Sequence, residues 1–141
     1  MTRVYWDAML FIYFLEDHPE HGERMQHILQ QMLIRGHVLC TSILTLGEIL
    51  VGVYKHGTEE QAAAVRSQIC PPLVELLPFS VKEADRFARI RAAHPVSPAD
   101  AIHLATAAEA GVQLFLTNDR TVSRQVIRGI DFIAKLDVNL Y

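Results

Sequence analysis

The sequence is poor in cysteine and lacks a long apolar segment. Its two cysteines, Cys40 and Cys70, have neither a close partner nor a metal-ligand spacing, which argues against a disulfide-rich secreted scaffold and a zinc module. The apolar stretch at residues 4–15 is interrupted by Asp7 and is shorter than the roughly 20 residues that a membrane-spanning helix needs. It has no basic leader and no small-residue cleavage site, so a secretory signal is not predicted. We therefore expect a reduced, cytoplasmic protein without a membrane span.

Strong charge and nucleotide-binding motifs are also absent. The net charge is −3 over 141 residues, which by itself does not indicate a nucleic-acid partner. No Gly-x-Gly-x-x-Gly motif follows the first predicted strand and no P-loop lysine is present, which argues against dinucleotide and P-loop nucleotide enzymes. Because the sequence contains no repeat, low-complexity tract or linker, we expect residues 1–141 to form a single domain.

What the sequence does contain is an alternation of short apolar runs and longer helical patterns. We expect strands at Arg3–Trp6, His37–Thr41, Val74–Pro78, Leu114–Thr117 and Asp131–Lys135. We expect helices at Ala8–Glu16, Glu20–Arg35, Ile43–Lys55, Thr58–Ile69, Val81–Ala93, Pro98–Ala110 and Arg120–Arg128. Apolar strands separated by helices favour a parallel sheet that is covered on both faces. The predicted fold is therefore α/β, with three layers and a doubly wound, five-stranded parallel sheet.

Two aspartates stand shortly after predicted strands. Asp7 follows the first strand, and Asp119 follows the fourth in the stretch LFLTNDR. In an open parallel sheet, functional residues gather outside the carboxyl ends of the strands, where the strand order reverses. If the first and fourth strands are neighbours there, the two carboxylates face each other. This placement would also explain a charge in an apolar stretch, because a buried carboxylate is costly unless it reaches a surface or a partner.

Two further acids are unusual for their surroundings. Glu48 is the only Asp, Glu, Lys or Arg between Arg35 and Lys55, and its neighbours one turn away on the predicted helix are apolar. A solvated glutamate normally has polar neighbours, so we expect Glu48 to have a polar or charged partner from elsewhere in the fold. The other acid is Asp100, in the stretch SPADAIHLATAAEAG near the start of a predicted helix.

Each aspartate also has a purely structural interpretation. Asp7 and Asp119 could cap the helices that follow them. Ser97, Pro98 and Asp100 form a pattern that is typical of a helix start. Capping explains each aspartate by itself, but it does not explain the glutamate, so the combination of four acids favours a functional site.

If the four carboxylates meet, they need a counter-charge. Two carboxylates about 5 Å apart repel by roughly 3 kcal/mol at an effective dielectric constant near 20. A cluster of four would therefore take up protons or bind a cation. Oxygen ligands alone suit a hard divalent ion, Mg²⁺ above all. Such a site is suited to phosphoryl chemistry, in which the metal activates water and stabilises the leaving oxygen.

The order and spacing of these motifs resemble a known family. An apolar strand ending in Asp7, followed by TLGEILVG, SPADAIHLATA and LFLTND, is similar to the PIN-domain ribonucleases. Within that family, the sequence most resembles the VapC-type toxins of bacterial and archaeal toxin–antitoxin pairs, over nearly the whole chain. The resemblance places the acidic quartet on Asp7, Glu48, Asp100 and Asp119. It places the Ser/Thr that precedes the last acid on Thr117.

This resemblance implies an endoribonuclease that depends on Mg²⁺ or Mn²⁺ and cleaves single-stranded regions of RNA. Asp7, Asp100 and Asp119 would hold the metal, and an activated water would attack the phosphodiester in line. The resemblance also implies a homodimer, together with an antitoxin whose tail blocks the acidic groove.

The sequence departs from the resemblance at Met9, where the family usually has Asn or Ser. A thioether cannot replace the hydrogen bond that such a residue offers to the metal site or substrate. The alternative function is therefore a catalytically weak or inactive PIN-like module that binds protein or RNA. A structural interpretation places Met9 in the core with Leu10 and Ile12. Other enzymes with similar sheets fit less well: a haloacid-dehalogenase-type phosphatase needs an aspartate at position 9, and a response-regulator receiver needs adjacent acids near Asp7.

Weaker candidates lie near the acids. Arg120, Arg124 and Arg128 would share one face of a predicted helix, where they either grip phosphate or face solvent. His103 lies one turn after Asp100 and is either a structural histidine or a substrate contact. The histidines of HPEHGERMQH do not complete a ligand set for zinc, so no zinc site is expected there.

Overall fold

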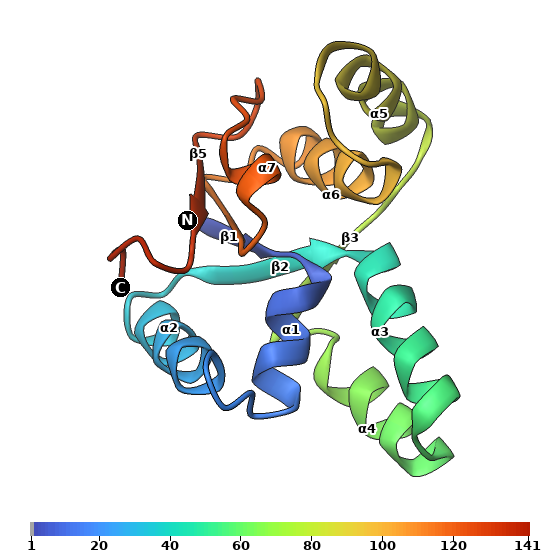
Figure 1. Cartoon of the computed structure of the whole chain (residues 1–141), viewed down its shortest axis with the longest axis vertical. Helices are drawn as coiled ribbons and strands as arrows, with labels where there is room; N and C mark the ends of the chain where they lie inside the picture. Colours follow the sequence, from blue (N-terminus) through green and yellow to red (C-terminus); the bar gives the residue numbers. More distant parts are fainter. Residues whose placement is uncertain (1) are drawn as a thin grey trace.

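The computed structural model describes residues 2–141, which form a five-stranded parallel sheet between two layers of helices (Figure 1). The strands lie in the order β3-β2-β1-β4-β5, and every neighbouring pair is parallel. Their bounds are β1 Arg3–Trp6, β2 Val38–Ser42, β3 Val74–Leu77, β4 Leu114–Thr117 and β5 Phe132–Lys135. The predicted three-layer, doubly wound α/β fold is confirmed.

The helices divide between the two faces of the sheet. One face carries α1, α2, α3 and α4, and the other carries α5, α6 and α7, as Figure 1 shows. Their bounds are α1 Ala8–Leu15, α2 Gly22–Ile34, α3 Ile43–His56, α4 Glu59–Gln68, α5 Val81–Ala93, α6 Pro98–Glu109 and α7 Arg120–Ser123. None of the helices within residues 2–141 combines the length and the apolar character that crossing a bilayer requires.

The central strand supplies both cores. Val4 and Trp6 of β1 are buried among the side chains of α1, α2, α3 and α4, whereas Tyr5 is buried on the opposite face against α6. Successive side chains of a strand point to opposite faces, so a strand between two helical layers must be apolar throughout. The uninterrupted apolar sequence before Asp7 follows from this position in the sheet.

The strand order reverses next to β1. The chain builds β2 and β3 on one side of β1 and then returns to place β4 and β5 on the other side. Trp6 pairs with Leu116, so β1 and β4 end side by side. Asp7 and Asp119 therefore leave the sheet at the same edge. The switch point that the sequence suggested is present.

The predicted length of the last helix is wrong. Instead of spanning Arg120–Arg128, α7 is a single turn that ends at Ser123. The chain then turns inward, which buries Ile127 and places the Arg128 carbonyl 3.0 Å from Nη1 of Arg86. Because this tertiary packing overrides the helical pattern, the three arginines at positions 120, 124 and 128 do not share a helical face.

Candidate active site

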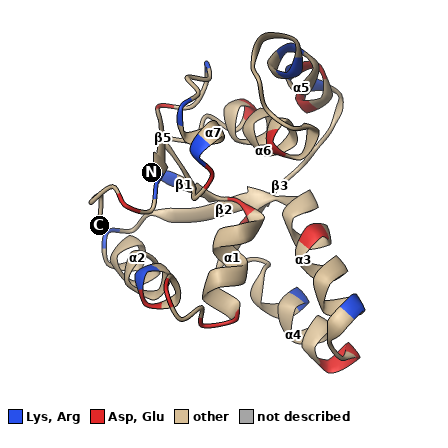
Figure 2. Ribbon diagram, viewed as in Figure 1, with Lys and Arg blue, Asp and Glu red and all other residues tan. Residues whose placement is uncertain are grey.

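A pocket of about 380 Å³ lies at the carboxyl ends of β1 and β4. Its lining includes all four acids selected from the sequence, Asp7, Glu48, Asp100 and Asp119. They come from the start of α1, the middle of α3, the start of α6 and the loop after β4. Figure 2 shows acidic segments at these places around the ends of the central strands. The fold thus brings together residues that are more than 100 positions apart in the chain.

Asp7 is a helix cap and also lines the pocket. Its Oδ1 accepts the Leu10 backbone N–H at 3.3 Å, and its Oδ2 accepts the Thr117 hydroxyl at 2.7 Å. Burial raises the pKa of Asp7, and the hydrogen bond from Thr117 offsets part of that rise. Capping and a place in the pocket are therefore not exclusive at this position.

Thr117 connects the two aspartates at the strand ends. Its hydroxyl is fully buried, donates to Asp7 and accepts the backbone N–H of Asp119 at 3.0 Å. The Asp119 carboxylate accepts the Val122 backbone N–H at 2.9 Å, which caps the short helix α7. One hydroxyl thus fixes the separation between the end of β1 and the loop after β4.

Asp100 lies in the first turn of α6 and is half-buried. Ser97 caps this helix by accepting the Asp100 backbone N–H at 3.2 Å. Burial is the main cause of the raised pKa of Asp100, and the negative charges of Asp119 and Glu48 raise it further. The repulsion expected among the acids is therefore present at this carboxylate.

Glu48 has one partner from a distant part of the chain. Its Oε1 lies 2.7 Å from Nε2 of His103, and its side chain is 43% exposed whereas that of His103 is 5% exposed. His103 is thus a satisfied, buried histidine that also touches one of the four acids. This pairing joins residues on α3 and α6, so no local pattern in the sequence could predict it.

The structure contradicts the interpretation of Met9 as a core residue. Met9 is 48% exposed and lines the acidic pocket, whereas Leu10 beside it is fully buried. The residue that departs from the family resemblance therefore faces the site. Arg120 and Arg124 are exposed near Asp119, but neither is part of the pocket lining.

Two polar residues of the pocket were not singled out from the sequence. Asn118 and Tyr13 both line it, and the Asn118 side-chain amide donates to the Tyr13 hydroxyl at 3.3 Å. Asn118 stands between Thr117 and Asp119 at a strand end, which is the signal that could have identified it. Tyr13 lies one turn after Met9 on α1, so the two side chains share one face of this helix.

The donor set of the pocket fits a hard divalent cation. Four carboxylates offer only oxygen, and a cation would offset both the burial of Asp7 and the repulsion at Asp100. Within residues 2–141, no three His, Cys, Asp or Glu side chains lie close enough together to form a ready ligand set. The carboxylates therefore surround a pocket with room for water, and Mg²⁺ in particular usually keeps several waters.

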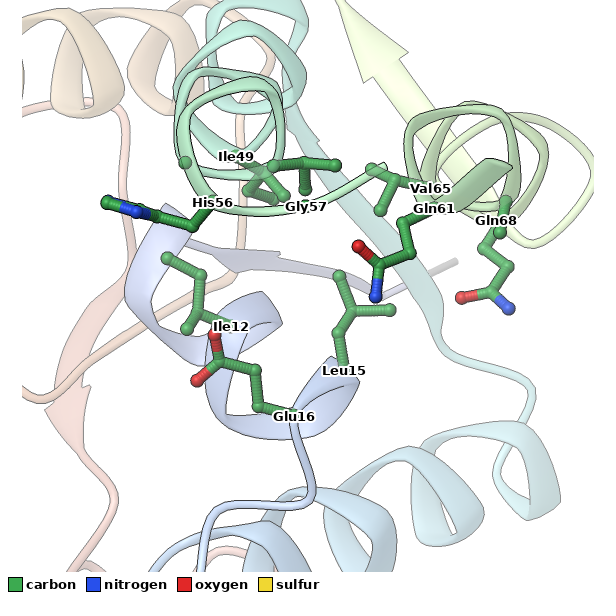
Figure 3. Close-up of a pocket in the computed structure, with 12 residues that line it drawn as sticks. Ile12, Leu15, Glu16, Ile49, His56, Gly57, Gln61, Val65 and Gln68 are labelled. Carbon is green, nitrogen blue, oxygen red and sulfur yellow. The ribbon is translucent and has the colours of Figure 1, made fainter. Parts of the chain in front are cut away.

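A second, larger pocket of about 440 Å³ has a different character. It lies between α1, α3 and α4, where Figure 3 shows Ile12, Leu15, Ile49 and Val65 around it. The lining is mainly apolar, with Gln61 and a few other polar side chains among these residues. A pocket of this kind suits an apolar segment of a partner rather than phosphoryl chemistry.

Comparisons with known proteins identify the family and the fold. A family model described as PIN domain matches residues 4–126. DNA-bound VapBC from Salmonella typhimurium contains a chain that is 25% identical, with a TM-score of 0.73 and coverage of 96% of this chain and 99% of that one. A search of the curated proteins finds no significant match.

Two further solved structures share the fold. One is a member of the VapBC family of toxin–antitoxin systems from Mycobacterium tuberculosis, which is 22% identical with a TM-score of 0.64 and coverage of 94% of this chain and 98% of that one. The other is the Sarcin-Ricin loop cleaving toxin VapC20 of the same organism, which is 15% identical with a TM-score of 0.70 and coverage of 89% and 97%.

Proposed function

Because this chain belongs to the PIN-domain family, we propose that it is a Mg²⁺- or Mn²⁺-dependent endoribonuclease that cleaves single-stranded regions of RNA. The observation that carries the proposal is the set of four carboxylates around one pocket at the switch point of the sheet. Ligand and catalytic sites of open α/β sheets lie at this place. One of the similar structures is a toxin that cleaves the Sarcin-Ricin loop, which supports RNA as the substrate.

The proposed roles follow from what each residue contacts. Asp7, Asp100 and Asp119 would hold the metal, whose chemistry when bound would be to activate water and to stabilise the leaving oxygen. Thr117 keeps Asp7 and Asp119 at a fixed separation through its two hydrogen bonds. Glu48 has one carboxylate oxygen held by His103 and the other without a hydrogen-bond partner in the described part of the chain, so it can orient the attacking water.

Basic side chains near the pocket complete the proposal. Arg120 follows Asp119 directly, and Arg124 lies one turn later, after the end of α7. Both are exposed and can contact phosphates of an RNA strand that enters the pocket. Their contribution is to affinity rather than to the chemical step.

We also propose that the protein is a cytoplasmic toxin that an antitoxin neutralises. Similar structures come from toxin–antitoxin systems, which supports a protein partner. The apolar pocket between α1, α3 and α4 offers a surface for an amphipathic segment of that partner, whose tail would then cover the acidic pocket. The family resemblance further suggests a homodimer.

A second candidate function is a non-catalytic module that binds protein or RNA. Met9 in the pocket lining favours this candidate, because its thioether offers no useful hydrogen bond to a metal-bound water or substrate.

Cleavage of a structured RNA with single-stranded loops separates the two candidates. With Mg²⁺ or Mn²⁺ we expect cuts that stop with chelator and leave 5′-phosphate and 3′-hydroxyl ends, because water is the nucleophile. A 2′,3′-cyclic phosphate would contradict the metal mechanism. RNA binding without cleavage at any metal concentration would favour the non-catalytic module.

A further inference from the structure

A buried chain of hydrogen bonds lies beneath the acidic pocket. The imidazole of His103 joins Glu48, at 2.7 Å from Nε2, to the phenol of Tyr5, at 2.6 Å from Nδ1. The Tyr5 hydroxyl also accepts the Ser42 backbone N–H at 3.1 Å. Tyr5 is fully buried and the His103 side chain is 5% exposed, so water does not compete for these bonds.

The partners decide where the hydrogens lie. The Ser42 backbone N–H can only donate, so the Tyr5 oxygen is its acceptor. A phenol keeps its proton at neutral pH, and Tyr5 donates it to the nearest acceptor, Nδ1 of His103 at 2.6 Å. His103 then carries its own proton on Nε2 and donates it to the Glu48 carboxylate.

The neighbouring threonines are consistent with this direction. Thr41 lies 2.7 Å from the Trp6 carbonyl, which can only accept, so the Thr41 proton points there. The Thr45 hydroxyl is 2.7 Å from the Thr41 oxygen and 3.3 Å from Nδ1 of His103. Thr45 therefore donates to Thr41 and leaves the Nδ1 lone pair to Tyr5.

The chain of bonds connects the segments that carry three of the four acids. Tyr5 lies two residues before Asp7, and His103 lies three residues after Asp100 on the same helix. We infer that Tyr5 and His103 are positioning residues that hold the Glu48 carboxylate at a fixed place relative to Asp7 and Asp100. The consequence for cleavage rests on the proposed nuclease function, whereas the consequence for the conformation of Glu48 does not.

Positioning explains this arrangement better than stability does. Apolar side chains could fill the places of Tyr5 and His103 without requiring buried hydrogen bonds, and such replacements are often neutral or stabilising. The Glu48 side chain is 43% exposed and would otherwise sample several rotamers in solvent. A buried donor with a fixed proton confines it to one.

Tyr5→Phe tests this inference with the loss of one oxygen. The ring stacks on Phe115 with centroids 4.8 Å apart, and phenylalanine keeps that contact. We expect kcat for RNA cleavage to fall about 10- to 100-fold, as for groups that orient catalytic ligands, with KM unchanged. His103→Gln, which retains a side-chain N–H donor, should keep more activity than His103→Leu.

Tyr141→Phe is the matched control. The Tyr141 hydroxyl makes an equivalent bond to a histidine, 2.8 Å from Nδ1 of His37, which lies just before β2 at the opposite end of the sheet. Both variants lose a phenol–imidazole hydrogen bond, so both can lose thermal stability. Only Tyr5→Phe should lower kcat, and equal kcat values in Tyr5→Phe and wild type would overturn the inference.

Nuclear magnetic resonance gives a readout that does not depend on cleavage. Long-range ¹H–¹⁵N spectra should show the proton of His103 on Nε2. Side-chain couplings of Glu48 should report one rotamer in the wild type and an average of several in Tyr5→Phe. A proton on Nδ1, or unchanged Glu48 couplings in the variant, would overturn the inference. A wild type that fails to cleave RNA but gives the expected spectra would refute the proposed function alone.

Discussion

The acidic pocket and the C-terminal segment, residues 136–141, use polar groups in opposite ways. Arg24 on α2 donates to three carbonyls of the C-terminal segment, those of Leu136, Val138 and Tyr141, at 3.1–3.3 Å. Arg35 donates to the Leu140 carbonyl and lies 5.0 Å from the centroid of the Tyr141 ring. These cations are matched to acceptors, so the segment is held against α2.

The acidic pocket, in contrast, leaves its charges unmatched. Within residues 2–141, no lysine or arginine forms an ion pair with any of its four acids, and the only such contact is that of Glu48 with His103. Yet the same chain matches charges elsewhere, for example in the Arg86–Glu109 pair at 3.0 Å. The difference indicates that the C-terminal segment serves stability, whereas the pocket keeps a residual electrostatic strain that a bound cation or a proton would relieve.

Asp119→Asn should have the largest effect, because it should abolish most cleavage in the acidic pocket without lowering the stability of the fold. Cleavage should fall on the order of 100-fold or more, since a metal ligand matters at least as much as the groups that orient it. Asparagine still caps α7, and removing one negative charge lowers the repulsion at Asp100, so stability should stay equal or rise by about 1 kcal/mol. Parallel cleavage assays and urea unfolding measure both. Unchanged cleavage would mean that Asp119 acts only as a cap, and a less stable variant would contradict the expected relief of repulsion.

Met9→Asn should increase the rate of RNA cleavage without disturbing the fold. Met9 is 48% exposed, so the change removes little core packing. A hydrogen-bonding side chain beside Asp7 should raise turnover by about 10- to 100-fold if such a group orients the site. The expected result is faster cleavage at an unchanged melting temperature. A fall in melting temperature without a gain in cleavage would contradict this account.

Arg24→Ala should affect the C-terminal segment alone. The substitution removes three hydrogen bonds from a charged donor to backbone carbonyls. We expect unfolding in urea to show a loss of about 2 kcal/mol, because hydrogen bonds to charged groups contribute about 1.5–3 kcal/mol and some of these carbonyls regain water. Cleavage at a temperature well below unfolding should not change. A proportional loss of cleavage would mean that the segment and the pocket are coupled.

Asp7→Asn should reveal the strain as a pH dependence of stability. Burial raises the pKa of Asp7 above its ordinary value of 3.8, so the folded chain holds this proton more tightly than the unfolded chain. The wild type therefore loses stability as the pH rises from the unfolded pKa through the folded one. Asparagine does not ionise and can still cap α1, so the variant should gain stability relative to the wild type across this range.

Unfolding in urea at several pH values, without metal, measures this difference. Addition of Mg²⁺ should stabilise the wild type more than the variant and reduce the gap. A difference that is constant with pH would show that the Asp7 carboxylate is not strained in the folded chain.

Much of the fold was predictable because strong local patterns agreed with it. The strand before Asp7 is apolar on both faces, and only a strand between two helical layers needs that pattern. The predicted helix over positions 120–128 failed because Ile127 gains more from burial than from continuing one turn of helix. Local propensity is weak compared with the burial of a large apolar side chain.

The sequence by itself determined the α/β class, the two strand-end aspartates and the unusual setting of Glu48, because periodicity and charge are properties of neighbouring residues. Only the tertiary structure decided that Met9 faces the pocket and that Glu48 pairs with His103, 55 positions away in the chain. Side-chain direction on an almost wholly apolar helix such as α1 depends on what packs against it. The hydrogen bond between Glu48 on α3 and His103 on α6 depends on how the two helices approach each other. A local sequence pattern therefore predicts neither the direction of the Met9 side chain nor this hydrogen bond.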